Sequence, residues 1–183
     1  MDRNQISSSF EEIQSYVCEK LEELDGDSFF ESDLWSRDQG GGGRTNTIKE
    51  GAVIEKGGVA FSKVFGAVSS QMSKQLKLDG DSFFATGVSI VLHSRKVEHP
   101  IIHMNIRYFE IDEDKYWFGG GIDLTPIYID EDLAIRFHQK LKKLCDKYDP
   151  SMYIRYKKWA DDYFYLSHRK ESRGVGGIFF DQM

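Results

Sequence analysis

The sequence predicts an α+β protein in which a mainly antiparallel β-sheet is covered by helices. The predicted elements follow one another as a helix, several strands, two helices and a final strand. This order lacks the regular strand–helix alternation of a doubly wound parallel sheet. Of the 183 residues, 40% are hydrophobic and 14% aromatic, which is enough apolar material for a substantial core. A chain of this length is expected to form a single domain over residues 1–183.

Helices are predicted where apolar residues recur at three- and four-residue steps. These segments are residues 9–25, 69–76, 131–147 and 151–167. Ser8 and Glu11 are a candidate capping box for the first helix, and Gly26 is its expected end. Asp130 is the expected N-cap of the third helix. Its predicted buried stripe is Leu133, Phe137, Leu141 and Leu144.

Strands are predicted where apolar and polar residues alternate between turn-forming residues. They include two strands between Thr47 and Phe65, the first with a turn near Glu50–Gly51 and the second beginning after Gly57–Gly58. Further strands are predicted at 83–93, 101–108, 115–118 and 174–183. Residues 27–46 are predicted to be irregular. They end in four glycines, which suit either a mobile loop or a loop that covers a ligand. No lysine stands where a Walker phosphate loop requires one.

Two of these strands are expected to form a hairpin that carries a polar face. Side chains alternate across a strand, so His103, Asn105 and Arg107 share one face while their neighbours point to the other. The connection between the strands is short, which favours antiparallel pairing. Ser89 and His93 would then lie near His103 and Asn105. A register shift of one residue would break this arrangement.

The residues on and near this face allow both functional and structural interpretations. Arg107 could bind a carboxylate through its planar fork, or pair with a nearby acidic side chain. Asp123 follows three glycines and could contact a bound ring, or form an Asx-type turn before Thr125–Pro126. Arg169 and Arg173 are candidate ion-pair partners of Asp161, Asp162 or Glu171. The dispersed histidines match neither HExxH nor CxxC spacing, so a metal site has only weak support.

Composition excludes several classes of protein. The net charge is −6 with a pI near 5.4, and no basic stripe is present, so no nucleic-acid partner is predicted. The two cysteines match no metal spacing and suit a reducing compartment. No run has transmembrane length and the N-terminus lacks a signal-peptide apolar region. A cytoplasmic location is therefore predicted.

Several strings of residues resemble oxygen-dependent coproporphyrinogen III oxidase. They are IHMNIRYFE, WFGGGIDLTP, KKWADDYFYLSHR and RGVGGIFFD, preceded by GGGG, EKGG and GVS. The resemblance runs in order from about Glu23 to Asp181. It implies a large flat antiparallel sheet with helices on both faces, in a homodimer.

The resemblance also implies an activity. The family removes two propionate carboxyl groups from coproporphyrinogen III, leaving vinyl groups and yielding protoporphyrinogen IX for haem and other porphyrins. Molecular oxygen is the co-substrate, and carbon dioxide and hydrogen peroxide are released. No organic cofactor is required. The need for a divalent metal varies between members.

Individual positions match the family's functional residues. His103 matches a proposed proton donor, and Asp123 matches an aspartate proposed to hold and deprotonate pyrrole N–H groups. The matches to substrate-contacting positions are Ser89, Asn105, Ile106 and Arg107. The matches to metal ligands of some members are His93, His103, His138 and His168. The match to a dimerisation segment is Thr47, Ile48, Lys49, Glu50, Gly51, Ala52, Val53, Ile54, Glu55 and Lys56.

Family members continue past the strand GGIFFD into segments that supply further substrate contacts and much of the dimer interface. The chain is therefore expected to be incomplete at its C-terminus, and to show little or no oxidase activity when expressed alone. The alternatives are a non-catalytic tetrapyrrole-binding or dimerising fragment, and a histidine-metal oxygenase.

Overall fold

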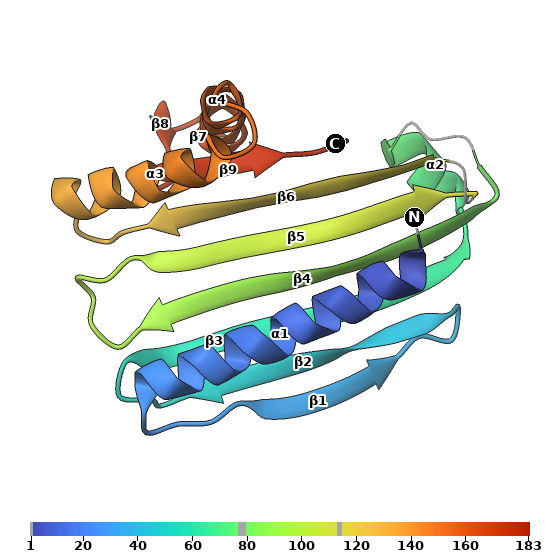
Figure 1. The fold of residues 1–183 in the computed structure, drawn as a ribbon, viewed down its shortest axis with the longest axis horizontal. Helices are drawn as coiled ribbons and strands as arrows, with labels where there is room; N and C mark the ends of the chain where they lie inside the picture. The colour runs from blue at the N-terminus through green and yellow to red at the C-terminus, as the bar shows by residue number, and fades with distance from the viewer. Residues whose placement is uncertain (1, 77–79, 113–114) are drawn as a thin grey trace.

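A broad antiparallel sheet forms the body of the computed structural model, which describes residues 2–76, 80–112 and 115–183. Within these residues the sheet has seven strands in the order β1-β2-β3-β4-β5-β6-β9 (Figure 1). Their bounds are β1 Glu31–Ser36, β2 Gly41–Lys49, β3 Ile54–Ala67, β4 Ser82–Ser94, β5 Ile101–Ile111, β6 Lys115–Thr125 and β9 Gly176–Phe180. The predicted α+β class with a large antiparallel sheet is confirmed.

Helices and a small hairpin complete the described elements. The helices are α1 Arg3–Asp25, α2 Ser70–Leu76, α3 Glu131–Cys145 and α4 Met152–Phe164. The hairpin pairs β7 (Tyr165–Leu166) with β8 (Glu171–Ser172). All four predicted helices are present, although α4 ends three residues earlier than expected. No helix in the described ranges is long and apolar enough to cross a membrane.

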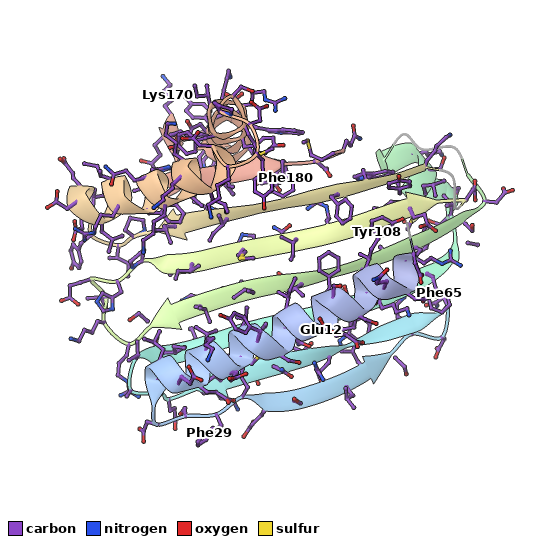
Figure 2. All side chains as sticks on the ribbon, in the orientation of Figure 1. Glu12, Phe29, Phe65, Tyr108, Lys170 and Phe180 are labelled. Carbon is purple, nitrogen blue, oxygen red and sulfur yellow. The ribbon has the colours of Figure 1, made fainter. Side chains whose placement is uncertain are left out.

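Helix α1 lies across one face of the sheet, in front of β2, β3 and β4 (Figure 1). We call this the helix face. Phe10 and Cys18 of α1 pack there against buried strand residues such as Val59, Val88 and Ile90. Removing such side chains from water supplies the main driving force for docking the helix. Tyr108, labelled in Figure 2, belongs to the same cluster and is almost fully buried.

Helices α3 and α4 pack at the opposite edge of the sheet, next to β9 (Figure 1). Leu141 and Cys145 of α3 and Tyr156 of α4 form a second core cluster with Ile178 of β9. Leu144 was predicted to be buried but is 49% exposed. Cys145 occupies the inward position instead. Burial raises the pKa of this free thiol, as it does for Cys18.

The N-terminus of α1 corrects one prediction. The helix begins at Arg3, with Asp2 as N-cap accepting a hydrogen bond from the Asn4 N–H, so Ser8 and Glu11 lie inside the helix. The added turn places Ile6 against the core, which explains why the earlier start is favoured. The predicted end is confirmed: Gly26 has a positive φ of 74° and its N–H bonds the Glu22 carbonyl.

The prediction that residues 27–46 are irregular is wrong for most of the segment, because β1 and the start of β2 lie there. β1 is an exposed edge strand, so it lacks the apolar alternation that marks a half-buried strand. The glycines of β2 leave space for atoms of the neighbouring strands. A Cβ atom at Gly43 would lie 2.5 Å from the Trp35 ring of β1. A close approach between strands, and not a ligand loop, accounts for this glycine.

The turn predicted near Glu50–Gly51 is confirmed between β2 and β3. Its backbone is held by Asp25 at the end of α1. The carboxylate accepts hydrogen bonds from the N–H groups of Ala52, Val53 and Ile54, and from Ser28. Burial raises the pKa of Asp25, but these donors outweigh it and hold the value at about 2. β3 then continues through Gly57–Gly58 without the break that was predicted.

Residues 119–125 were predicted to leave the strand, and this is also wrong. β6 runs without interruption from Lys115 to Thr125, so Gly119, Gly120 and Gly121 are strand residues. β5 and β9 pair with β6 on its two sides. The backbone N–H and C=O groups of β6 therefore have hydrogen-bond partners on both sides. This pairing offsets the low strand propensity of glycine.

Candidate active site on the polar face

The second face of the sheet carries the chemically reactive side chains, and we call it the polar face. β4 and β5 pair as predicted, with Ser89 opposite Asn105. On the next pair of strands, His103 lies opposite Asp123. Ser89 and Val91 are exposed, so within the described residues the centre of this face is open to solvent. The hairpin register therefore unites Ser89, His103 and Asn105 on one surface.

Asp123 is the most deeply buried of these polar groups, with 2% exposure. Its Oδ1 lies 3.0 Å from Nδ1 of His103. Its Oδ2 accepts a hydrogen bond of 3.0 Å from Nη2 of Arg173. Asp123 is therefore not the Asx-turn residue that was one of its interpretations. A carboxylate on Nδ1 fixes the ring and favours the tautomer with Nε2 free for chemistry.

Arg173 is the third member of this cluster. From the sequence, its candidate partners were acidic residues of the region 161–171. Asp161 and Asp162 instead bond Lys157 and Lys158, one helical turn away. Of the pairs that were expected, Arg169 with Glu171 forms in the described part of the chain. The Arg173 guanidinium also lies 4.3 Å from the centre of the Phe164 ring. Fifty residues separate Arg173 from Asp123, so no local sequence signal pointed to the contact.

Arg107 lies on the same face, nearer the other end of β5. Its Nη1 donates a 3.1 Å hydrogen bond to Oδ1 of Asn105. Its Nη2 forms a 2.9 Å ion pair with Oδ2 of Asp181, which the sequence had not suggested as a partner. The side chain remains 38% exposed, so donors of the guanidinium stay accessible. An arginine in this state suits a carboxylate ligand.

Small residues form a floor between these charged groups. By strand alternation and register, the floor consists of Gly58, Ala60, Ser62, Gly87, Ser89, Gly119 and Gly121. Few side-chain atoms stand above the backbone at these positions. A planar ligand could approach the backbone closely here.

Ile106 differs from the other predicted substrate contacts. It pairs with Val88, and its side chain packs in the core beneath α1. Its side chain therefore points to the helix face, away from Asn105 and Arg107 on either side. Only its backbone is available to a ligand on the polar face.

The four predicted metal ligands are not brought together in the described part of the chain. Both ring nitrogens of His138 are engaged, Nε2 with the Val175 carbonyl at 2.9 Å and Nδ1 with the Tyr153 hydroxyl at 3.0 Å. His168 is exposed in the turn between β7 and β8. No group of three or more His, Cys, Asp or Glu among the described residues is arranged to hold a metal ion. The histidines do not fit one metal centre.

The residues matched to dimerisation lie at one end of the sheet. They comprise the end of β2, the following turn and the start of β3. Ile48 and Ile54 point inward and are buried. Lys49, Glu50 and Glu55 are exposed. The segment thus combines a fixed backbone with a charged outer surface.

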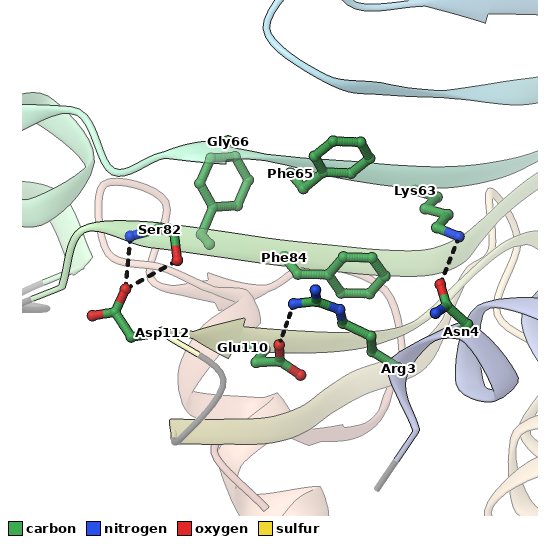
Figure 3. Close-up of a pocket in the computed structure, with 10 residues that line it drawn as sticks. Arg3, Asn4, Lys63, Phe65, Gly66, Ser82, Phe84, Glu110 and Asp112 are labelled. Carbon is green, nitrogen blue, oxygen red and sulfur yellow. Dashed lines mark hydrogen bonds and ion pairs between the residues drawn. The ribbon is translucent and has the colours of Figure 1, made fainter.

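Two cavities of about 500 Å³ lie apart from the His103–Asp123 pair, and His93 contributes to the lining of the second. Figure 3 shows the first, beside the N-terminus of α1, where Arg3 pairs with Glu110 and Lys63 bonds Asn4. The second lies between α1 and α3 and has a largely apolar lining that includes Leu92 and Phe137. Neither cavity contains His103 or Asp123, so neither is the candidate active site.

The fold and site together define an α+β protein whose open polar face carries a carboxylate-bound histidine and a partly exposed arginine. The family model for coproporphyrinogen III oxidase matches residues 5–183. The chain therefore belongs to the coproporphyrinogen III oxidase family.

Three relatives illustrate the match, and each bears the name oxygen-dependent coproporphyrinogen-III oxidase. The human mitochondrial protein is 44% identical over 94% of this chain and 41% of its own length. The Drosophila melanogaster protein is 45% identical over 99% of this chain and 50% of its own length. The Glycine max chloroplastic protein is 44% identical over 99% and 51%, respectively. The chain thus spans about half the length of these relatives.

Proposed function

We propose that the protein acts as an oxygen-dependent coproporphyrinogen III oxidase. It would convert two propionates of coproporphyrinogen III to vinyl groups, giving protoporphyrinogen IX. The observation that carries this proposal is the His103–Asp123 pair, placed with Arg107 around the small-residue floor of the polar face. Family membership supports the choice of substrate.

The atoms of the reaction show why a proton donor is needed. For each propionate, R–CH2–CH2–COO⁻ + O2 + H⁺ gives R–CH=CH2 + CO2 + H2O2. A C–H bond and the C–C bond to the carboxylate break, and their electrons form the new double bond and reduce oxygen to peroxide. One proton is consumed. His103 is positioned to supply it, because Asp123 engages Nδ1 and leaves Nε2 for the reactants.

Arg107 is the proposed partner of a substrate propionate. Its exposed guanidinium matches a carboxylate in shape and charge. The small-residue floor beside it would support the macrocycle, with Ser89 and Asn105 as polar contacts. In this scheme the protein supplies orientation and electrostatics, while the electron-rich substrate carries the redox chemistry.

Asp123 has two possible modes of action in this proposal. A direct contact with pyrrole N–H groups requires Arg173 or His103 to move, because Asp123 is only 2% exposed and both of these side chains are bonded to its oxygens. The observed geometry favours a role through His103. The carboxylate holds the ring and stabilises the cation whenever His103 takes up a proton.

No organic cofactor is needed in this proposal, because molecular oxygen is the oxidant. No step is assigned to a metal, since the predicted histidine ligands do not converge. A homodimer formed through residues 47–56 is a further part of the proposal, supported by the exposed charged residues at the end of β2 and the start of β3. Sedimentation of Glu50→Lys and Glu55→Lys variants would test it: loss of the dimer supports this interface, and an unchanged dimer contradicts it.

The cytoplasmic location stays a prediction. Among the relatives, the human protein bears a mitochondrial name and the Glycine max protein a chloroplastic one. Fractionation of cells expressing the full natural chain with a C-terminal tag would decide between the cytoplasm and an organelle.

The oxidase activity is tested by incubating the full natural chain with coproporphyrinogen III, with and without oxygen and with and without a chelator. The proposal predicts carbon dioxide and peroxide only with oxygen, in the presence or absence of chelator. Loss of activity on chelation would indicate a metal oxygenase. Tight binding without carbon dioxide release would indicate a tetrapyrrole-binding protein.

A further inference from the structure

The end of β9 departs from regular pairing with β6. Phe180 pairs with Gly120 in the regular register. Beyond it, Met183 and Phe118 exchange backbone hydrogen bonds of 2.9 and 3.1 Å. Regular pairing would place residue 182 opposite Phe118. The chain therefore holds one extra residue in this stretch.

Asp181 and Gln182 together lie opposite Gly119, which is the arrangement of a β-bulge. Gln182 accommodates the extra residue with a positive φ of 54°, a conformation that is uncommon outside glycine. Bulges change the direction in which a side chain points, and they often occur next to active sites. Here the affected side chain is Asp181, which reaches Arg107.

Gly119 makes that contact possible. It lies on β6, opposite Arg107 on β5 and beside Asp181 at the end of β9. A Cβ atom at Gly119 would lie 2.5 Å from Oδ1 of Asp181 and 2.9 Å from Cζ and Nε of Arg107. No side chain fits between the two groups. The missing Cβ thus lets a carboxylate and a guanidinium meet across an intervening strand.

Two further neighbours of the guanidinium are Asn105 and Phe179. Asn105 accepts a hydrogen bond from Nη1, and the Phe179 ring lies 6.0 Å from Cζ. A free arginine side chain populates many rotamers, and ordering it on binding costs affinity. Arg107 already has Asn105 and Asp181 as partners in the absence of a ligand, while 38% of its side chain stays exposed.

We propose that Asp181 is a positioning residue that orients Arg107 for a substrate carboxylate. This inference rests on the proposed function for the identity of that carboxylate, a propionate of coproporphyrinogen III. An opposite effect is physically conceivable, because an anion beside Arg107 also reduces its attraction for substrate. The two effects change affinity in opposite directions when the charge of Asp181 is removed.

The first experiment needs no substrate. ¹⁵N relaxation of the Arg107 Nε–H, assigned by its loss in Arg107→Lys, is compared between the wild-type protein and Asp181→Asn. The inference predicts a rigid Nε–H that becomes mobile in the variant. Equal mobility in the two proteins would overturn the inference, whatever the substrate proves to be.

The second experiment measures function in the full natural chain. We expect Asp181→Asn to raise KM for coproporphyrinogen III and Kd for coproporphyrin III about 10-fold, with kcat within about two-fold. Asp181→Glu should restore part of the affinity. Gly119→Ala should reproduce the loss although both charged groups remain. Unchanged or tighter binding by Asp181→Asn would overturn the inference.

Asp162→Asn is the matched control, because Asp162 forms an exposed ion pair with Lys158 outside the site. It should leave KM, Kd and the Arg107 signal unchanged. If wild-type protein shows the rigid Arg107 signal but neither binds coproporphyrin III nor turns over its porphyrinogen, the proposed function fails. The positioning of Arg107 by Asp181 then stands on the relaxation data alone.

Discussion

Oδ1 of Asp123 lies 3.0 Å from Nδ1 of His103, on adjacent strands whose register places the two residues directly opposite each other. Asp123 is almost fully buried, whereas 36% of the His103 side chain is exposed. The contact therefore links a fixed charge inside the protein to a proton-carrying group at the surface. Arg173 closes the other side of the carboxylate.

Replacing Asp123 by Asn should strongly reduce turnover. The amide removes the negative charge that orients His103, so we expect kcat for coproporphyrinogen III in the full natural chain to fall about 100-fold or more. Thermal unfolding of the variant separates this effect from loss of structure. Asp146→Asn, which alters an exposed ion pair with Lys142, is the control. Activity of Asp123→Asn within about two-fold of wild type would contradict the proposed role.

Asp25 should contribute to stability in a pH-dependent way. Its pKa is about 2 in the folded chain and 3.8 ordinarily, so the folded state takes up the proton less readily. The stabilisation is complete above about pH 4 and is lost as the pH falls toward about 2. Asp25→Asn removes the negative charge. It also replaces one acceptor oxygen by an NH2 group, which cannot accept the hydrogen bonds of the backbone N–H groups. Chemical denaturation should show a loss of about 2 kcal/mol at pH 7 and a smaller difference at low pH.

Asp27→Asn provides a neighbouring control for the Asp25 variant. Asp27 is exposed, so its replacement should change the unfolding free energy by less than about 0.5 kcal/mol. If the Asp25 and Asp27 variants have the same stability at pH 7, the buried carboxylate does not hold the turn between β2 and β3.

Gly51→Ala tests the same contact from the side of the turn. A Cβ atom at Gly51 would lie 2.6 Å from the Asp25 carboxyl carbon, so the methyl group must displace the carboxylate or the turn. We expect a loss of about 1–3 kcal/mol in chemical denaturation. Gly58→Ala is the matched control, because the nearest atom to its added Cβ is the Asn46 carbonyl oxygen at 3.9 Å. Equal costs for the two variants would refute the steric argument.

Gln14 should be important for docking α1 onto the sheet. It is fully buried, and its Nε2 donates to the carbonyls of Arg44 and Val59. Its Oε1 accepts a hydrogen bond from Nε of Arg44. Gln14→Leu removes the hydrogen-bond partner of the two carbonyls and of the Arg44 guanidinium. The free energy of unfolding should therefore fall by about 1–3 kcal/mol. The same change at exposed Gln139 of α3 should have little effect, and similar losses at both sites would argue against the contact.

Local pattern predicted much of the polar face. The alternation at His103, Asn105 and Arg107 determined their common side, because side chains of a strand point to alternate faces. The short connection from residue 94 to residue 100 also indicated the correct hairpin, with Ser89 opposite Asn105. The end of α1 at Gly26 and the cap of α3 at Asp130 were predictable, because both depend on adjacent residues.

Other features depended on residues distant in the chain. The three glycines of β6 have low strand propensity, and only pairing with β5 on one side and β9 on the other keeps them extended. This pairing moved Asp123 from an expected turn into a strand. It also brought Arg173 within 3.0 Å of Asp123, although fifty residues separate them.

The sequence by itself determined the approximate positions of the helices, the α+β class and the side of β5 that bears the reactive groups. These depend on interactions between near neighbours, which periodicity and turn residues record. Only the tertiary structure decided the partners of Asp123 and Arg107. A carboxylate accepts from any donor within reach, and the pairing of β6 with β9 decides which donor that is.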